Sequence, residues 1–140
     1  MELIAEKLAI KPNATHTVRV MVIDDDDEFC KIVKQMLEPS GYEVQAINNP
    51  VKALEQYTYD KDKIDLVILD YYMPGLDGGK TFEWLRRLNA QVKVILCSGA
   101  DELRLRQLMV KHSLDGYIHK PFRIQEAIQT IDSVLAAPQR

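Results

Sequence analysis

Acidic side chains are crowded into one short stretch of the sequence, MVIDDDDEF, from Met21 to Phe29. An apolar run ends there against four aspartates and a glutamate. Carboxylates held close together repel one another, raise one another's pKa values and lose hydration energy when they are buried. A stable fold therefore needs an opposite charge at this place, and a divalent cation would supply it.

Other polar residues stand at the ends of later apolar runs. Asp70 ends IDLVILD, Ser98 follows VKVILC, and Lys120 stands before Pro121 in GYIHKPF. Oxygen ligands without a His or Cys cluster suit Mg²⁺, which proteins hold with one or two carboxylates, water and a phosphate oxygen. Lys120 offers a positive charge to a phosphoryl group, and the Ser98 hydroxyl offers a hydrogen bond. An aspartate between a metal and a lysine can act as a nucleophile toward phosphorus.

Apolar runs and amphipathic segments alternate along the chain and predict the elements that position these residues. The predicted strands cover 18–23, 42–47, 64–70, 92–97 and a short stretch from Gly116. Each is followed by a helix, and Asn49 with Pro50 predicts the start of the second helix. This alternation indicates an α/β fold with a parallel sheet, right-handed crossovers and helices on both faces.

An open, doubly wound sheet is favoured because five such units are few for a closed eight-stranded barrel. Ligands of open α/β sheets bind outside the carboxyl ends of the strands, so Asp24, Asp25, Asp70, Ser98 and Lys120 should converge there. The first helix is expected to face the core with its apolar positions, which are Phe29, Ile32, Val33, Met36 and Leu37.

Composition excludes several classes of protein. With 140 residues, 46% of them apolar and 28% charged, we expect a single domain. The net charge of −3 lacks the basic excess of most nucleic-acid-binding proteins, so we expect no direct DNA contact. Cys30 and Cys97 have neither the number nor the spacing of a disulfide framework or zinc site, which indicates a reduced, cytoplasmic setting. No apolar run is long enough for a membrane span, and we expect no membrane contact.

From about Val18 to Leu135 the chain resembles the receiver domain of two-component response regulators, the CheY-like fold. Four pieces carry the resemblance in order and spacing: VIDDD, DLVILDYYMPGLDG, ILCSG and GYIHKPF. The resemblance implies a flavodoxin-like (βα)5 fold with a five-stranded parallel sheet in the order 2-1-3-4-5. It also implies a signalling switch that assists its own phosphorylation and dephosphorylation, not an enzyme.

The resemblance assigns the phosphoacceptor and metal roles. Asp70 resembles the phosphorylated aspartate, which receives its phosphoryl group from a phosphohistidine on a sensor histidine kinase or a histidine phosphotransfer protein. Asp24, Asp25 and Asp70 resemble the Mg²⁺ ligands, with the backbone carbonyl of Tyr72 completing the site. Lys120 resembles the residue that contacts the phosphoryl group.

Two further positions resemble the family's switch. Ser98 is the expected switch hydroxyl, which moves toward a phosphoryl oxygen, and Tyr117 is the expected aromatic residue, which turns inward behind it. The partner-binding surface would be the fifth strand with the helices on either side. The downstream partner or output domain is not indicated by the sequence.

Each assignment has a structural alternative. Asp24, Asp25 and Asp70 could be a solvated rim of strand ends, Ser98 a helix cap and Tyr117 part of the core. Asp26, Asp27 and Glu28 are expected to be helix-start residues, and Asp77 to shape its loop.

Other functions are conceivable for the whole chain. A pseudoreceiver would bind partners without phosphorylation. A Mg²⁺-dependent phosphohydrolase of the haloacid dehalogenase kind needs a second aspartate where Tyr72 stands, and a flavodoxin-like cofactor binder needs hydroxyls and glycines where the first turn has aspartates.

Three segments are expected: an N-terminal extension at 1–17, flexible or a short helix, a receiver domain at 18–137, and a tail at 138–140. No output domain follows the last helix, so we expect either a stand-alone receiver or a fragment of a longer regulator.

Overall fold

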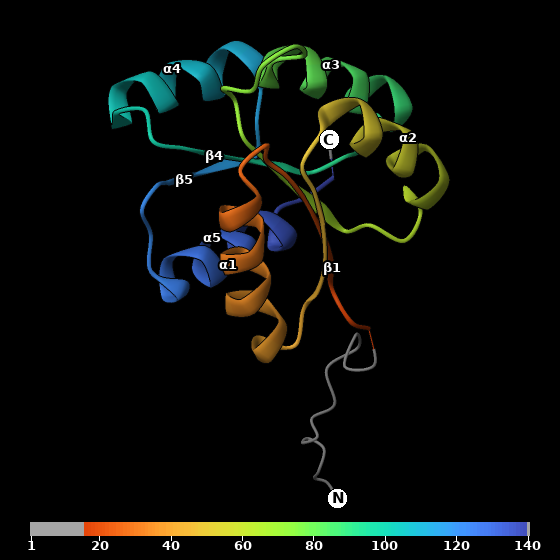
Figure 1. Ribbon diagram of the computed structural model, residues 1–140, viewed down its shortest axis with the longest axis vertical. Coiled ribbons are helices and arrows are strands. Elements are labelled where there is room, and N and C mark those ends of the chain that lie inside the picture. Colours follow the sequence, from red (N-terminus) through yellow and green to blue (C-terminus); the bar gives the residue numbers. More distant parts are fainter. Residues whose placement is uncertain (1–15, 140) are drawn as a thin grey trace, which may run out of the picture.

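Strands and helices alternate without interruption along the chain in the computed structural model, which describes residues 16–139 (Figure 1). The strands are β1 (Arg19–Ile23), β2 (Glu43–Ile47), β3 (Leu66–Leu69), β4 (Val94–Ser98) and β5 (Gly116–His119). The α-helices are α1 (Asp27–Leu37), α2 (Pro50–Asp60), α3 (Gly78–Leu88), α4 (Glu102–His112) and α5 (Ile124–Ala136). A short 3-10 helix, η1 (Glu38–Ser40), follows α1. Most of the expected extension at 1–17 lies outside the described residues.

The five strands form one parallel sheet in the order β2-β1-β3-β4-β5. Helices α1 and α5 cover one face, and α2, α3 and α4 cover the other (Figure 1). The predicted doubly wound α/β fold with the order 2-1-3-4-5 is therefore confirmed. Strand β1 lies between β2 and β3. The order of the strands therefore changes direction at β1, which is the switch point of the sheet.

Side chains of the central strands alternate between two cores, one on each face of the sheet. Met21 and Ile23 of β1 point to the layer of α2, α3 and α4, while Val20 and Val22 point to the layer of α1 and α5. All four of these side chains are fully buried. The sheet is thus held from both sides, which fixes the positions of its strand ends.

Helix α1 departs from the expected pattern of burial. Val33 and Leu37 are buried as predicted, but Ile32 is 45% exposed, and Phe29 and Met36 are only half-buried. Cys30, which was not part of the predicted stripe, is buried, and its thiol donates to the Asp24 carbonyl at 3.3 Å. The reason is that α1 packs only against the sheet and α5, and these neighbours cover less than the full width of the apolar stripe. Part of the stripe is left beside the carboxyl ends of the strands.

Aspartates and one asparagine cap the helices that begin near that edge. Asp26 accepts hydrogen bonds from the backbone N–H groups of Glu28 and Phe29 at the start of α1. Asn49, Asp77 and Asp101 cap α2, α3 and α4 in the same way. The prediction that Asp26 starts a helix is confirmed, and Asp77 caps α3 at the end of its loop. Among the residues described, no helix combines the length and the apolar character that crossing a membrane requires.

Candidate functional site

Three carboxylates meet where β1 and β3 end. Backbone hydrogen bonds continue one residue past each strand, from Asp24 N–H to the Ile47 carbonyl (3.2 Å) and from Asp70 N–H to the Ile23 carbonyl (2.9 Å). Asp24 and Asp70 are therefore brought to the same edge, and Asp25 follows directly. One oxygen from each of Asp24, Asp25 and Asp70 lies within 4.8 Å of the others. We call these three side chains the acidic pocket.

Burial separates the members of the acidic pocket. Asp24 is 1% exposed and Asp70 8% exposed, whereas Asp25 is exposed to solvent. Asp24 Oδ1 accepts a hydrogen bond from the Asp26 N–H (2.9 Å), and Asp24 Oδ2 accepts one from Lys120 Nζ (2.7 Å). A buried carboxylate is costly unless it is paired in this way. Two buried acids of this kind are not a solvated rim of strand ends.

Asp70 is held by one backbone donor and is electrostatically strained. The Tyr72 N–H donates to Asp70 Oδ1 at 3.2 Å. Burial, followed by the charges of Asp24 and Asp25, raises the pKa of Asp70 to about 6, although Lys120 and the Tyr72 N–H act in the opposite direction. A nearby cation would relieve this strain and favour the carboxylate.

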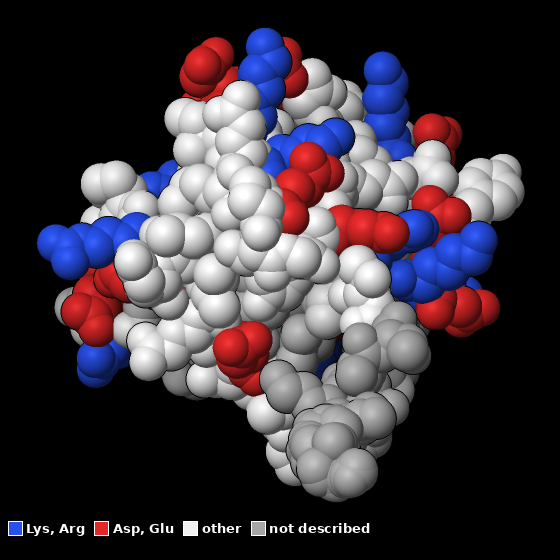
Figure 2. Space-filling view, turned by 90° about the horizontal axis from the view of Figure 1, so that it is seen from below, with Lys and Arg blue, Asp and Glu red and all other residues white. Residues whose placement is uncertain are grey.

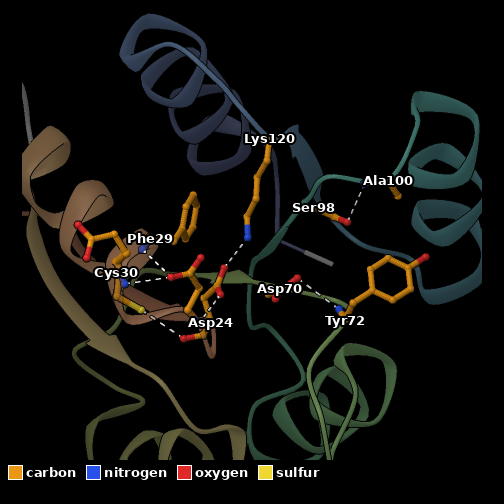
Figure 3. A network of polar contacts seen from close by, with 10 residues as sticks. Asp24, Phe29, Cys30, Asp70, Tyr72, Ser98, Ala100 and Lys120 are labelled. Carbon is orange, nitrogen blue, oxygen red and sulfur yellow. Dashed lines mark hydrogen bonds and ion pairs between the residues drawn. The ribbon is translucent and has the colours of Figure 1, made fainter.

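Lys120 reaches the pocket from the loop after β5 (Figure 3). Its ammonium pairs with Asp24 and also lies 4.0 Å from the centre of the Phe29 ring. Burial opposes the positive charge, but the hydrogen bond and charge of Asp24, together with the charge of Asp70, outweigh it and raise the pKa of Lys120. The Lys120–Pro121 peptide bond is cis.

Ser98 ends β4 and is buried beside the same edge. It is 1% exposed, and its Oγ accepts a hydrogen bond from the Ala100 N–H at 3.1 Å (Figure 3). Helix α4 is capped by Asp101, so Ser98 is not its N-cap. The Ser98 hydroxyl can therefore donate a hydrogen bond to an acceptor in the pocket.

Two of the predicted residues direct their side chains away from the carboxylates. The Tyr117 hydroxyl donates to the Glu102 carboxylate at 2.9 Å, on the exposed side of α4. The Tyr72 side chain is 53% exposed, and its hydroxyl accepts a hydrogen bond from Arg104 Nε at 3.4 Å. In Figure 3 the Tyr72 ring points away from Asp70. The metal contact expected from the Tyr72 backbone carbonyl remains a prediction.

The donor set of the pocket fits a hard divalent cation. Its three carboxylates are oxygen donors, and the Lys120 ammonium beside them balances only one of the three negative charges. Among the described residues, the group whose ligand atoms lie close enough to hold one ion contains no cysteine, and burial raises the pKa of Cys30 to about 11 and that of Cys97 to about 12. Both thiols therefore stay protonated at neutral pH.

Three residues that contact the predicted site residues were not themselves predicted as functional. Glu102 and Arg104 on α4 hold the hydroxyls of Tyr117 and Tyr72, and Phe29 lies against Lys120. Phe29 packs against the core beneath α1, as its place in the apolar stripe predicts, and its ring also reaches Lys120. Its position in the first turn of α1 after the acidic run is the signal in the sequence that places it at the pocket.

We expect Asp70→Asn to stabilise the metal-free protein. The pKa of Asp70 rises from 3.8 to about 6 on folding, so its charged form destabilises the fold above pH 6. Removing that charge should raise the free energy of unfolding at pH 7 by about 1–3 kcal/mol. As the pH falls from 6 to 4, the Asp70 carboxyl of the wild type becomes protonated in the folded state while it is still charged in the unfolded state. Protonation therefore stabilises the wild type, and the difference in the free energy of unfolding between Asp70→Asn and the wild type should disappear near pH 4.

Urea denaturation in the presence of a chelator, repeated across this pH range, measures the effect. Asp62→Asn, at an exposed turn, is the control and should change stability by less than about 0.5 kcal/mol. A variant at Asp70 that is less stable than wild type at pH 7 would contradict the expectation.

Comparison with known proteins places the chain in a family. Residues 20–132 match the model of the response regulator receiver domain. The two-component response regulator ARR12 of Arabidopsis thaliana is 38% identical over 109 residues, which are 78% of this chain and 18% of that protein. The response regulator MprA of Mycobacterium leprae is 29% identical over 118 residues, 84% of this chain and 51% of that protein. The chain matches only part of such relatives, from about a tenth to about half of their length.

Solved structures agree with this result. A response regulator receiver domain protein from Clostridium thermocellum superposes with a TM-score of 0.78 at 27% identity, covering 84% of this chain and 94% of that one. The CheX-CheY-BeF3-Mg²⁺ complex of Borrelia burgdorferi gives a TM-score of 0.79 at 22% identity, covering 86% and 90% of the two chains. The chain belongs to the response regulator receiver domain family, whose members are signalling switches of two-component systems.

Proposed function

We propose that Asp70 is the phosphoacceptor of this receiver domain. The observation that carries the proposal is the buried Asp70 carboxylate, which shares a pocket with Asp24, Asp25 and the Lys120 ammonium. Its raised pKa, about 6, marks a carboxylate that is poorly compensated. Perturbed titratable groups of this kind are typical of functional sites. The donor is a phosphohistidine on a sensor histidine kinase or a histidine phosphotransfer protein.

The pocket holds Mg²⁺ in this proposal. Asp24, Asp25 and Asp70 supply carboxylate oxygens, and the Tyr72 backbone carbonyl is a further ligand. When bound, Mg²⁺ neutralises charge that develops on the oxygens of the phosphoryl group. The Asp25 carboxylate is exposed to solvent and would be open to an ion, while Asp24 would share its charge between the ion and Lys120.

The transfer step follows from the side chains. An Asp70 oxygen attacks phosphorus, a new P–O bond forms, and the P–N bond to the donor imidazole breaks with its electron pair returning to nitrogen. Lys120 faces the negative charge of the phosphoryl oxygens, and the Ser98 hydroxyl can donate to one of them. The protein therefore acts mainly by positioning these groups and by stabilising charge.

Phosphorylation would then change the surface formed by α4, β5 and α5. A phosphoryl group brings roughly two negative charges and strong acceptor oxygens to the buried edge. Ser98 moves toward it, and Tyr117, which is held by Glu102 in this structure, turns inward. The altered surface binds a downstream protein or an output domain.

Direct nucleic-acid contact and membrane contact are not part of the proposal, and the cytoplasm is the proposed location. Figure 2 shows one face of the molecule, where, over the part that the structure describes, Lys and Arg side chains lie among Asp and Glu. A mixed surface of this kind gives no strong attraction for a phosphate backbone.

Intact-mass spectrometry tests the proposal. The protein is incubated with Mg²⁺ and acetyl phosphate, and the experiment is repeated with Asp70→Ala and with a chelator. We expect one phosphoryl adduct on the wild type, and no adduct on the variant or without Mg²⁺. No adduct on the wild type under any condition would favour a pseudoreceiver that binds partners without phosphorylation, and an adduct that persists in Asp70→Ala would place the acceptor elsewhere.

A further inference from the structure

The Phe29 ring lies against the one ammonium that faces the acidic pocket in the part of the chain that the structure describes. Lys120 Nζ is 4.0 Å from the ring centre, within the range of a cation–π contact. The ring packs against Phe122 in a T-shaped arrangement, with ring centres 6.0 Å apart and planes 81° apart. The N–H of Phe29 is fixed by the Asp26 side chain at 3.2 Å. Phe29 is therefore held at its backbone and by the contact of its ring with Phe122.

Lys120 has two attachments in this pocket, and they differ in kind. The first is the hydrogen bond to Asp24 at 2.7 Å, and the second is the face of Phe29 (Figure 3). Asp24 is also an expected ligand of a divalent cation. When its charge is shared with such a cation, its hold on Lys120 weakens, and the two positive charges repel each other. The attraction of the ring face does not depend on that shared charge.

Apolar surroundings strengthen the second attachment. Phe29, Phe122 and Pro121 line a hollow with Ile32 and Met36 beside the Lys120 stem. The Lys120 side chain is only 23% exposed, so water screens the contact less than at an open surface. A ring kept in this half-buried place is available to orient the ammonium, whereas a core side chain would only fill space.

We propose that Phe29 is a positioning residue, whose ring face keeps the Lys120 ammonium directed at the phosphoryl site of Asp70. This inference rests on the proposed function of Asp70. Leucine or another aliphatic side chain at position 29 would fill a similar volume but would not attract the ammonium. The position of Lys120 would then depend on Asp24 alone, whose charge is shared with the bound cation. In this proposal Phe29 acts on the reaction through Lys120.

Fluorination of the ring tests the electrostatic part of this role, because it weakens the negative face with little change of shape. Phe29 is replaced by mono-, di- and trifluorophenylalanine, and Phe29→Leu is compared with them. We expect the rate of phosphorylation by acetyl phosphate at saturating Mg²⁺ to fall stepwise, by about three- to tenfold at the end of the series. The dissociation constant of Mg²⁺, measured by calorimetry, should not change.

Phe82 on α3 provides a matched control. The Arg86 guanidinium lies 4.5 Å from the centre of the Phe82 ring, so the contact is of the same type but belongs to another part of the fold. The same fluorinated residues at position 82 should leave the rate unchanged. A rate that falls equally in both series would show a general effect of fluorination and would overturn the inference.

NMR gives a readout that needs no phosphorylation. The ring current of Phe29 should shift the Cε protons of Lys120 upfield, and Phe29→Leu should remove that shift. A wild type that is phosphorylated at Asp70 but shows a flat fluorination series, or no ring-current shift, overturns the role of Phe29 alone. If the wild type is not phosphorylated at all, the proposed function of Asp70 is contradicted, and so is this inference, which depends on it.

Discussion

Lys120→Met should lower the free energy of unfolding of the metal-free protein by about 2–4 kcal/mol, because it leaves the buried Asp24 carboxylate without its positive partner. Asp24 is 1% exposed and receives the Lys120 ammonium at 2.7 Å. Methionine keeps the length of the side chain and its apolar contacts beside Phe29. The loss is therefore one of charge compensation.

Magnesium should restore part of that loss, since the cation takes over the compensation that Lys120 provides. The measurement is urea denaturation of both proteins in a chelator and in excess Mg²⁺, where an ion that binds only the folded state stabilises it by mass action. The rate of phosphorylation should nevertheless stay far below that of wild type, because Mg²⁺ does not replace the contact of Lys120 with the phosphoryl group.

Lys34→Met is the matched control for the loss of an ion pair. Lys34 faces Glu38 at 4.0 Å on the surface of α1, with both side chains about half exposed. An exposed pair of this kind contributes about 0–0.5 kcal/mol. Equal stability of Lys120→Met and wild type in the chelator, or an equal deficit with and without Mg²⁺, would show that the charge of Lys120 does not balance the acidic pocket.

Gly78→Ala should disrupt the loop that carries Asp70. The Gly78 N–H donates to the Tyr71 carbonyl at 2.7 Å, and a Cβ at position 78 would overlap the Tyr71 Cα and lie 2.8 Å from the Asp70 carbonyl oxygen. These are backbone atoms next to the proposed phosphoacceptor and cannot turn aside as a side chain can. We expect a loss of about 3 kcal/mol or more in stability and a melting temperature lower by about 10 °C or more.

Gly79→Ala, one residue further on, provides the comparison. A Cβ there would meet side-chain atoms, at 3.1 Å from His112 Cε1 and 3.3 Å from the Tyr71 hydroxyl, and these can shift by a few tenths of an ångström. Alanine also favours a helix over glycine by about 1 kcal/mol. Calorimetric melting curves should therefore place Gly79→Ala near wild type. Similar melting temperatures for the two variants would show that the contact of Gly78 with the backbone of Asp70 and Tyr71 does not require a glycine at position 78.

Much of the fold was predictable from local patterns. Continuous apolar runs such as VRVMVI and IDLVILD are typical of strands covered on both faces, and the cap residue Asn49, followed by Pro50, marks the start of a helix by its own chemistry. The boundaries were less accurate: β3 begins at Leu66, although the apolar pattern begins at Ile64. Boundaries depend on the pairing of strands, which is not a local property.

The acidic pocket was predictable for a related reason. Since every strand is parallel, polar residues that follow strands must lie at one edge, so the sequence positions of Asp24, Asp70, Ser98 and Lys120 already placed them together. The types of residue then narrowed the chemistry to a hard cation and a phosphoryl group. The roles of these residues stay predictions that phosphorylation experiments will test.

The sequence by itself determined the order of the elements, the edge of the sheet at which the polar residues meet and the family to which the chain belongs. Only the tertiary structure decided which partners those residues have: Lys120 pairs with Asp24, Tyr117 with Glu102, and Phe29, which packs against the core, also lies against Lys120. The physical reason is that repeating patterns of polarity act over a few neighbouring residues. Contacts between side chains distant in sequence depend instead on how the helices pack across the sheet, and packing is settled only when the whole fold is assembled.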